Sequence, residues 1–500
     1  MKPTIGLEIH VQLNTKSKLF CSCPAISFGV APNFNICPVC TGHPGVLPVL
    51  NYGAVERLVQ MGVALGCSIR PLSIFARKNY FYPDLPKSYQ ISQFEEPLAE
   101  RGSMEFFSGG KKKIVRIHRI HLEEDAGKLL HAIGSAELDH SLVDFNRSGL
   151  PLAETVTEPD LADAAQASDF LVALRATLRA LGVSACDMEK GEMRVDVNVS
   201  VAPEGGPLGN RVEIKNLNSF KNVRDALDHE IARQTKALAA GETIAQETRL
   251  WDVKRNATSP MRNKEDSSDY RYFPEPDLLP LEVSDEWVER VRRATPLVPA
   301  KKMERYQEEF GLGPKEAQTL VFLEAQEAGV LFEETLHLAA GEGASGGKGN
   351  AASFETKKVL AKSAANWILN DLLGHLAAQG LDFASCGMTP ARLAAFLNIV
   401  TSQGLSSRLA KDLFGKLLAD PKLDPKAACV GLEVLSDEAD LLAHVRAAIE
   451  ENPKAVSEYL GGKEKAVQAL VGSVMKKTRG QAHPQKLQEL FLRELASKKG

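Results

Sequence analysis

Two stretches of strict alternation constrain the fold of this chain more than any other feature. Residues 4–13 and 193–201 carry an apolar side chain at every second position, and most positions between them carry a polar or charged one. This period of two is typical of a β-strand that lays one face on a core. The opposite faces carry Glu8, His10 and Gln12 in the first stretch and Arg194, Asp196, Asn198 and Ser200 in the second. We therefore expect a sheet whose polar face carries the functional side chains.

Before residue 295, short strand-like runs alternate with turn signals, and two apolar stripes of helical period interrupt them. The first stripe predicts a helix with Ser168 as its N-cap and Gly182 as its stop. The second stripe, over residues 220–238, predicts a helix that ends at Gly241. Both stripes are typical of scaffold helices that cover a sheet.

After residue 295 the chain becomes rich in Ala and Leu, with a clear helix start at Thr389-Pro390. A Gly/Ala/Ser-rich stretch over 341–353 predicts a flexible loop within this helical region. A chain of 500 residues is too long for a single core. The pattern therefore predicts an α+β multidomain protein with a sheet-containing domain over 1–294, a helical domain over 295–420 and a tail over 421–500.

The composition is that of an ordinary globular protein, with 44% apolar and 25% charged residues. The formal charge of −4 argues against a globally basic nucleic-acid binder, so any RNA contact must come from a local patch. Such a patch begins at Gly461, after which Lys and Arg outnumber the acids. No segment approaches the roughly 20 apolar residues of a membrane span, and no signal or transit peptide is evident, so we expect a cytoplasmic protein.

Four of the eight cysteines crowd into twenty residues, while the others are scattered. The four are Cys21, Cys23, Cys37 and Cys40. Four thiolates form a closed tetrahedral site that suits structural zinc and leaves no position open for catalysis. The alternative is a set of reduced cysteines with no metal, and a disulfide framework is not expected in a chain of this kind.

Three adjacent acids follow a predicted strand within the segment 121–128, which reads His-Leu-Glu-Glu-Asp-Ala-Gly-Lys. Either a solvated loop or a hard cation such as Mg²⁺ explains why a folded chain holds three like charges together. Segments 77–87 and 270–278 mix cations, aromatic rings and prolines, which suits phosphate and base contacts or a rigid loop under the sheet.

Segments 144–154 and 213–219 add further carboxylates, cations and amides. Together with the alternating strands they favour a site for a nucleotide with Mg²⁺, where positioning and charge neutralisation carry most of phosphoryl transfer. No Walker, kinase or Rossmann motif is present, and no Ser or Cys lies in a nucleophile motif.

These motifs, in this order, resemble the GatB family of the aspartyl/glutamyl-tRNA amidotransferases. The resemblance rests on segments 6–13, 77–93, 121–128, 144–154, 213–219 and 269–278, the cysteine pairs, and the stretch 469–480. It implies an α/β cradle domain built on a mainly antiparallel sheet over 1–294. An all-helical domain over 295–420 and a YqeY-like helical tail over 421–500 that binds tRNA would follow.

The resemblance also implies the activity. The family is a ligase that forms carbon–nitrogen bonds with glutamine as the amide donor, in a heterotrimer (GatCAB) with an amidase subunit (GatA) and a small subunit (GatC). The GatB chain uses ATP and Mg²⁺ to activate the side-chain carboxylate of Glu-tRNA(Gln) or Asp-tRNA(Asn). Ammonia from the amidase then gives Gln-tRNA(Gln) or Asn-tRNA(Asn).

The match of motifs implies a set of site residues. Expected metal ligands and catalytic residues are Glu8, His10, Glu124, Glu154 and Glu213, with Lys78 as a further catalytic residue. Expected cofactor contacts are Lys78, Lys215, Asn216 and Arg147, and expected tRNA contacts are Lys476, Lys477 and Arg479.

One departure from the family pattern is Ser88, which stands where the family usually has Gly. Two other readings compete with the resemblance. The first is a non-catalytic, zinc-containing scaffold that binds tRNA, which ATP turnover would exclude. The second is a stand-alone ATP-dependent carboxylate–amine ligase, against which the basic tail argues. The choice between Glu-tRNA and Asp-tRNA stays open.

Overall fold

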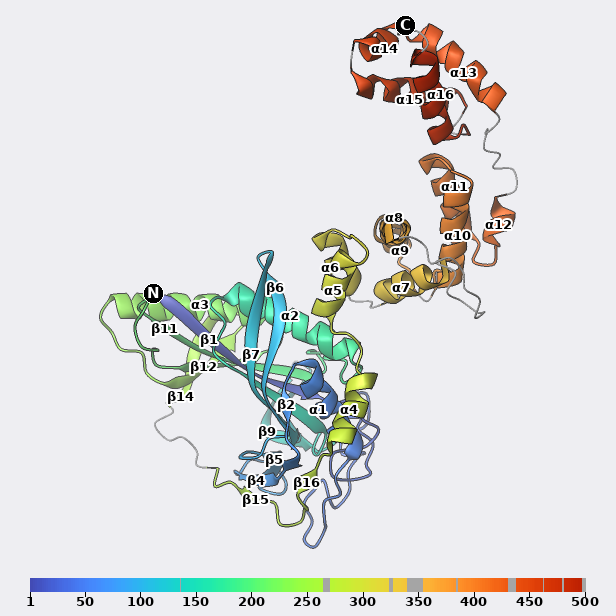
Figure 1. The fold of residues 1–500 in the computed structure, drawn as a ribbon. Coiled ribbons are helices and arrows are strands. Elements are labelled where there is room, and N and C mark those ends of the chain that lie inside the picture. Colours follow the sequence, from blue (N-terminus) through green and yellow to red (C-terminus); the bar gives the residue numbers. More distant parts are fainter. Residues whose placement is uncertain are drawn as a thin grey trace. The chain divides into compact units, whose positions relative to one another are not determined.

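The computed structural model describes residues 1–134, 136–263, 270–322, 327–339, 354–383, 385–429, 438–461, 463–478 and 481–496. The chain forms two compact units, residues 1–301 and 302–500 (Figure 1). The first unit is rich in strands and the second is helical, which confirms the predicted α+β class. The predicted boundaries at 294 and 420 stay predictions.

A nine-stranded sheet forms the framework of the first unit. Its strands, in spatial order, are β14 (Ala257–Asn263), β13 (Glu247–Asp252), β12 (Val212–Leu217), β11 (Met193–Ala202), β1 (Lys2–Gln12), β10 (Pro151–Thr157), β7 (Lys111–Glu124), β6 (Ala99–Ser108) and β2 (Ser68–Ile69). All neighbouring strands are antiparallel except the parallel pair β12 and β13. The expectation of a mainly antiparallel sheet is confirmed.

The two alternating stretches are β1 and β11, which lie side by side at the centre of the sheet. Their apolar side chains are buried, as Ile9 and Val197 illustrate with no exposed surface. Helices α1 (Tyr52–Ala64), α2 (Ala164–Ala180) and α3 (Phe220–Ala239) pack on the sheet, α1 and α2 on β6 and α3 on β11 (Figure 1). The polar side chains of these strands are therefore left for the other face.

The predicted start of the first helical stripe, which forms α2, is wrong by five residues. Asp163, not Ser168, is the N-cap of α2, and its carboxylate accepts a hydrogen bond from the Gln166 amide. The apolar stripe in the sequence predicted too late a start, because small buried alanines rather than leucines occupy the first turn. The predicted ends are confirmed, since Gly182 and Gly241 adopt the left-handed conformation just after α2 and α3.

Three small sheets complete the first unit: β15 (Phe273–Pro274) with β4 (Phe75–Asn79) and β5 (Tyr89–Gln93); β16 (Leu281–Glu282) with β3 (Leu72–Ser73); and β8 (Lys128–Ile133) with β9 (Ala136–Asp144). The first of them joins segments 77–87 and 270–278. Arg77 donates to both carboxylate oxygens of Glu275 at 2.8 Å and stacks on Tyr89 at 4.3 Å from the ring centre. Strand β5 packs against the end of β7. Helix α4 (Asp285–Ala294) packs on α1.

In the described residues of the second unit, the named elements are all helices, joined by turns and loops. Its first part contains most of α5 (Pro299–Glu308), then α6 (Pro314–Phe322), α7 (Glu327–Ala339), α8 (Phe354–Asn366), the π-helical turn η1 (Trp367–Leu372), α9 (Leu373–Gln379), α10 (Pro390–Ser402), α11 (Ser407–Ala419) and α12 (Pro425–Ala428). Thr389 caps α10 and Pro390 opens it, as predicted. The predicted loop at 341–353 lies outside the described residues.

The tail contains α13 (Glu438–Glu451), α14 (Pro453–Leu460), the 3-10 turn η2 (Glu464–Ala466), α15 (Val467–Lys477) and α16 (Pro484–Ala496). A core of its own holds these helices together, with Leu441, Leu470 and Phe491 fully buried. Among the described residues, no helix is long and apolar enough to cross a membrane.

Candidate active site

A row of ionisable side chains crosses four strands at the centre of the sheet. The register pairs Arg194 of β11 with His10 of β1, His10 with Glu154 of β10, and Glu154 with His121 of β7. Side chains that are directly opposite on neighbouring antiparallel strands point to the same face. The register therefore brings residues from positions 10 to 194 into one cluster.

The cluster contains two imidazoles between carboxylates. Nε2 of His10 lies 3.4 Å from an oxygen of Glu123 and 3.4 Å from Oε2 of Glu154. Nε2 of His121 lies 3.3 Å from the same Oε2 of Glu154. Glu123, Glu154 and His121 are all buried. Two sets of ligand atoms can each hold a metal ion, since the atoms within each set lie within 4.8 Å of one another. The sets are Glu8, His10 and Glu154, and His121, Glu123 and Glu154.

The electrostatics of the cluster favour the charged forms of His10 and Glu154 but not that of Glu8. Burial alone would lower the pKa of His10, but the carboxylates of Glu154 and Glu123 raise that pKa to about 9. Burial alone would raise the pKa of Glu154, but the two imidazoles lower it well below its usual range. Burial, together with the neighbouring Glu154 carboxylate, raises the pKa of Glu8. The pKa values of Glu8 and Glu154 are therefore shifted in opposite directions within one site.

Lys78 of β4 faces the same cluster from the small sheet. Burial alone would lower the pKa of its ammonium, but the nearby carboxylates of Glu123 and Glu154 raise it. Its Nζ lies 5.1 Å from the ring centre of Tyr270. Lys78, which was predicted as a site residue, therefore brings one positive charge to the carboxylates of Glu123 and Glu154.

Two of the five predicted metal ligands lie outside both ligand sets. Glu124 is buried, and its Oε1 accepts from the backbone amide of Ile91 at 2.8 Å and forms an ion pair with Lys87. Adjacent residues of a strand point to opposite faces, and here Glu123 rather than Glu124 faces His10. Glu213 of β12 accepts from the Thr248 hydroxyl at 2.8 Å.

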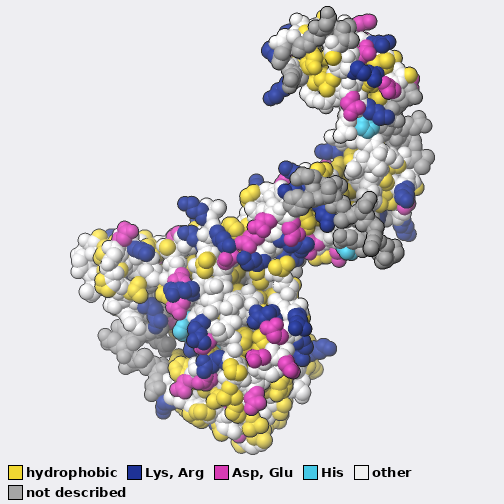
Figure 2. Space-filling view, viewed as in Figure 1, with side chains coloured by type: hydrophobic (Ala, Val, Ile, Leu, Met, Phe, Trp, Pro, Cys, Tyr) yellow, Lys and Arg dark blue, Asp and Glu magenta, His cyan; other side chains and the backbone are white. Residues whose placement is uncertain are grey.

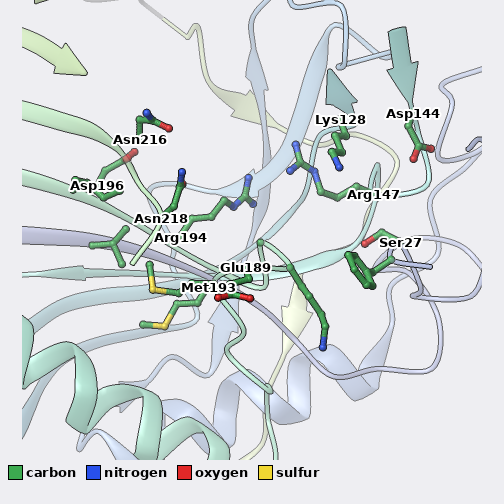
Figure 3. Close-up of a pocket in the computed structure, with 16 residues that line it drawn as sticks. Ser27, Lys128, Asp144, Arg147, Glu189, Met193, Arg194, Asp196, Asn216 and Asn218 are labelled. Carbon is green, nitrogen blue, oxygen red and sulfur yellow. The ribbon is translucent and has the colours of Figure 1, made fainter. Parts of the chain in front are cut away.

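A cavity of about 510 Å³ lies beside the cluster, within the size range of small-molecule sites. Two predicted contacts, Arg147 and Asn216, line it together with Lys128 and Arg194 (Figure 3). Arg147 and Arg194 extend toward one another across the cavity (Figure 3). Since Arg194 is paired with His10 in the register, the cavity adjoins the carboxylates.

Hydrogen bonds hold the cationic lining in place. Arg194 contacts Oδ1 of Asp125 at 2.9 Å, and Arg147 donates to the carbonyl oxygens of residues 126 and 127 at 3.1 and 2.5 Å. The predicted Lys215 is not among the lining residues; it donates to Asp196 at 2.6 Å. Asn216 has a positive φ of 65° and donates to the carbonyl of Trp251 at 3.0 Å.

Comparison with known proteins identifies the family. The model of the GatB/GatE catalytic domain matches residues 3–289, and the model of the GatB domain matches residues 352–495. This chain belongs to the GatB family. It is similar over nearly its full length to proteins named as the B subunit of aspartyl/glutamyl-tRNA(Asn/Gln) amidotransferase. The relative from Elusimicrobium minutum is 46% identical over 99% of both chains, and that from Thermodesulfovibrio yellowstonii is 44% identical over 98% of both. The relative from Persephonella marina is 44% identical over 99% of both chains.

Ser88, which was expected to depart from the family pattern, lies in a backbone conformation that is unusual for serine. Ser88 has a φ of 59°, in the left-handed region that favours glycine. Its amide donates to the Leu85 carbonyl at 3.0 Å, which holds the turn between β4 and β5. The serine therefore closes this turn in a conformation that glycine adopts without strain.

The four clustered cysteines lie together in the loop that follows β1, with their sulfur atoms within 4.8 Å of one another. The Sγ atoms of Cys37 and Cys40 are 3.9 Å apart. Thiolates bound tetrahedrally at about 2.3 Å are about 3.8 Å apart, so this spacing fits zinc. The Cys21 thiol, by hydrogen bonding to Cys40, lowers the pKa of Cys40, and burial raises the pKa of Cys23 to about 11.

A buried lysine lies against the cysteine cluster. Lys18 has no exposed surface, and its Nζ lies 3.6 Å from Sγ of Cys40 and 3.3 Å from the Phe145 carbonyl. The cluster is also joined to the active-site turn, because the Ser148 hydroxyl donates to the Cys40 carbonyl at 3.0 Å. The cysteine loop therefore supports the segment that carries Arg147.

The predicted tRNA contacts lie at the end of α15. Lys477 forms an ion pair with Glu451 of α13, and Lys476 is exposed. Arg479 lies outside the described residues.

The list of predicted site residues omitted His121, Glu123 and Arg194, although the adjacent acids of segment 121–128 were considered as a Mg²⁺ site. The sequence does contain a signal for these residues. Arg194 lies on the polar face of an alternating strand. The alternation Arg119, His121, Glu123 runs along one face of β7. That His121 would meet His10 could not be seen, because it depends on β10 lying between their strands.

Proposed function

We propose that this chain activates the side-chain carboxylate of an amino acid misacylated to tRNA, using ATP, and transfers ammonia to it. The tRNA substrates are Glu-tRNA(Gln), Asp-tRNA(Asn) or both, and the products are Gln-tRNA(Gln) and Asn-tRNA(Asn). The observation that carries the proposal is a buried cluster of carboxylates and imidazoles beside a cavity lined by Lys128, Arg147 and Arg194. Family membership supports it, because the similar proteins are named for this transamidation.

The reaction has two steps. A carboxylate oxygen of the substrate attacks the γ-phosphorus of ATP, which forms an acyl phosphate and releases ADP. The nitrogen of ammonia then attacks the acyl carbon, the C–O bond to phosphate breaks, and the nitrogen loses a proton. The products are the side-chain amide and inorganic phosphate. Neither step needs a nucleophile from this chain, which agrees with the lack of a Ser or Cys nucleophile motif.

Residues of this chain would position the phosphate groups. The guanidinium groups of Arg147 and Arg194 are suited to bind phosphate oxygens in the cavity, and Arg binds such groups in a bidentate manner. Lys78 brings an ammonium to the carboxylate cluster. A partly buried cation of this kind stabilises charge that develops on transferring phosphate.

The donor set fits Mg²⁺. Glu8, His10 and Glu154 would hold it, since their ligand atoms lie within 4.8 Å of one another and carboxylate oxygens are the ligands Mg²⁺ prefers. Bound there, Mg²⁺ would neutralise charge on the triphosphate. The chain holds these three ligands on β1 and β10, two neighbouring strands at the centre of a packed sheet, so they are pre-positioned.

The cysteine cluster would hold a structural zinc ion. Four sulfur ligands close the coordination sphere, so the site contributes stability rather than chemistry. Residues Lys18 and Ser148 connect it to the turn at 144–150. Metal analysis of the purified protein should find zinc near one equivalent.

The chain would act within a heterotrimer with an amidase subunit, which releases ammonia from glutamine, and a small third subunit. Large apolar side chains are exposed in the loop between β1 and α1, including Phe28, Phe34 and Val49. Figure 2 shows hydrophobic side chains gathered at the lower end of the first unit. Exposed apolar surface of this kind suits a protein interface. The reduced cysteines and the tRNA substrate suit the cytoplasm.

The tail would bind the tRNA body through Lys476, Lys477 and Arg479. Lys477 is already paired with Glu451, so a phosphate would have to compete with that carboxylate. Contacts of this kind bind phosphates without reading sequence.

The test is amidation by the reconstituted complex carrying Glu154→Gln. We expect ATP-dependent amidation of mischarged tRNA to be lost and glutamine hydrolysis by the partner to be kept. Glu158→Gln is a matched control, because Glu158 lies just beyond the same strand and pairs with exposed His118 at 3.0 Å. Amidation by Glu154→Gln at the wild-type rate would contradict the proposal and favour a scaffold role.

A further inference from the structure

A stacked pair of aromatic rings lies near the carboxylate cluster, and neither of the two reaction steps uses it. The rings of Phe94, which follows β5, and Tyr272, which precedes β15, are parallel within 5°, with their centres 4.1 Å apart. Phe94 is 41% exposed and Tyr272 is half-buried. A parallel pair in which one ring is exposed can accept a further flat ring, such as a nucleobase.

An arginine flanks the exposed ring. The guanidinium carbon of Arg119 lies 5.8 Å from the ring centre of Phe94. Arg119 is half-buried, and among the described residues its Nε finds no hydrogen-bond partner. Its cross-strand neighbour Glu100 is paired with Arg70 and Arg101 instead. An arginine whose donors are not all used within the protein is free to serve a ligand, and bases stack on aromatic rings and on guanidinium planes.

A strained backbone fixes the position of Tyr272. Arg271, just before it, has a φ of 45°, in the left-handed region that residues with a side chain rarely adopt. Asn79 of β4 stabilises this conformation, because its amide donates to the Tyr270 carbonyl at 2.9 Å and its side chain donates to the Arg271 carbonyl at 2.8 Å. Backbone strain of this kind is concentrated at active sites and ligand-binding sites. The stack is therefore held ready for a ligand.

The stack lies within the reach of one amino acid from the carboxylate cluster. Arg119 and His121 are two residues apart on β7, so their Cα atoms are about 7 Å apart and their side chains share one face. Burial and the nearby carboxylates of Glu123 and Glu154 raise the pKa of Tyr272 to about 12. A glutamyl group esterified to a ribose oxygen extends roughly 6–7 Å to its side-chain carboxylate. A nucleoside on the stack can therefore present its amino acid to the cluster.

The stack and the cationic cavity lie on opposite sides of the cluster. The cavity is lined by Arg194 of β11, whereas Arg119 is on β7, and β1 and β10 lie between these strands. Three strand spacings separate β11 from β7 by about 14 Å. In phosphoryl transfer the attacking and leaving oxygens lie roughly in line through phosphorus. With the ATP phosphates in the cavity, the substrate carboxylate therefore arrives from the β7 side.

We propose that the 3′-terminal adenine of the mischarged tRNA stacks on Phe94, with Tyr272 beneath that ring and Arg119 beside the base. The inference rests on the proposed function, because a substrate esterified to a nucleoside has to place a base one amino acid away from the reacting carboxylate. Every tRNA ends in the same adenosine, so one fixed platform serves tRNA(Gln) and tRNA(Asn) alike. Phe94, Tyr272 and Arg119 are thus substrate-positioning residues.

The experiment is a double-mutant cycle between the protein and the tRNA, and it needs no turnover. Binding to the reconstituted complex is measured for intact tRNA(Gln) and for tRNA(Gln) that lacks its terminal adenosine. With the wild type, removal of the adenosine should weaken binding by roughly 5- to 150-fold, the range for one stacked base. With Phe94→Leu, which keeps an apolar contact but no ring, removal should have little effect. A merely structural defect would weaken the binding of both tRNAs equally.

Three further variants complete the cycle. Phe94→Tyr keeps the ring and should behave as the wild type. Arg119→Met should reduce the effect of the terminal adenosine, and it is the second probe if Phe94→Leu does not fold, as judged by its thermal unfolding. Arg116→Met is the matched control for Arg119→Met, because Arg116 lies on the same strand but is exposed and pairs with Asp160 at 2.7 Å.

Two outcomes overturn the inference while leaving the proposed function intact. The first is a loss of the adenosine that affects the wild type and Phe94→Leu equally. The second is a Phe94→Leu complex whose KM rises for ATP and not for Glu-tRNA(Gln), because the stack would then hold the adenine of ATP. A wild-type complex that does not amidate mischarged tRNA with ATP would instead contradict the proposed function, whatever the cycle shows.

Discussion

Replacing Lys18 with methionine tests whether the cysteine cluster binds zinc as four thiolates. Lys18 has no exposed surface, and its ammonium lies 3.6 Å from Sγ of Cys40. Four thiolates around Zn²⁺ carry a net charge of −2, so the site needs a nearby cation. Methionine keeps most of the length and the apolar stem of the side chain but removes the charge.

The structure sets the size of the effect. At 3.6 Å, two unit charges attract by about 4–5 kcal/mol at an effective dielectric constant of about 20. The cost of burying the ammonium offsets part of this attraction. We expect a net loss of about 2–3 kcal/mol in zinc binding, which is a decrease in affinity of roughly 30- to 150-fold.

The assay is competition for zinc between the purified protein and a chromophoric chelator. Lys16→Met is the matched control, because Lys16 is exposed and lies only two residues away. Lys18→Met should release zinc at much lower chelator concentration than the wild type or Lys16→Met. Equal retention by all three proteins would refute the view that Lys18 balances thiolate charge.

Three further predictions concern stability. Glu230 has no exposed surface and contacts Arg249 at 3.5 Å, so Glu230→Gln should lower the free energy of unfolding by about 3–5 kcal/mol, as measured in urea. Burial alone would raise the pKa of Glu230, but hydrogen bonds from Arg233 and its neighbours lower it. Its stabilisation is therefore complete above about pH 4.5 and is lost as the pH falls through the lowered pKa, a loss that Glu230→Gln should lack in a pH series. Gly149 has a φ of 81°, and a Cβ there would lie 3.3 Å from Cβ of Cys40, so Gly149→Ala should cost about 1–2 kcal/mol and hasten zinc release.

The sheet face could be predicted from the sequence because the signal is local. In β1 and β11, the alternation alone identified which residues are buried, among them Ile5 and Val199. The same alternation placed Glu8 and His10 on the chemical face, where the structure has them. A strand with one buried face fixes the orientation of every side chain along it.

The membership of the site could not be predicted in full, because it depends on register. Glu123 and Glu124 are adjacent and chemically alike, and only the pairing of β7 with β10 decides which of them reaches His10. The structure directs Glu124 to Lys87 and the Ile91 amide instead. A one-residue difference in register exchanges the two faces.

The cysteine cluster could be predicted from the sequence, but the role of Lys18 beside it could not. Two cysteine pairs within twenty residues, with turns between them, were enough to predict a common site, and the structure brings the four sulfurs together. The role of Lys18 was not predicted, because nothing in its sequence neighbourhood distinguishes it from exposed Lys16. Its burial results from packing against Cys40 and against the carbonyl of Phe145. Phe145 lies more than a hundred residues away in the sequence.

An oxygen label tests directly whether the substrate carboxylate attacks ATP. Glu-tRNA(Gln) or Asp-tRNA(Asn) is prepared with ¹⁸O in the side-chain carboxylate and amidated by the complex with ATP and glutamine. We expect the released phosphate to carry one labelled oxygen for each amide formed, because the carboxylate oxygen leaves on phosphorus. Unlabelled phosphate released alongside the amide would contradict it.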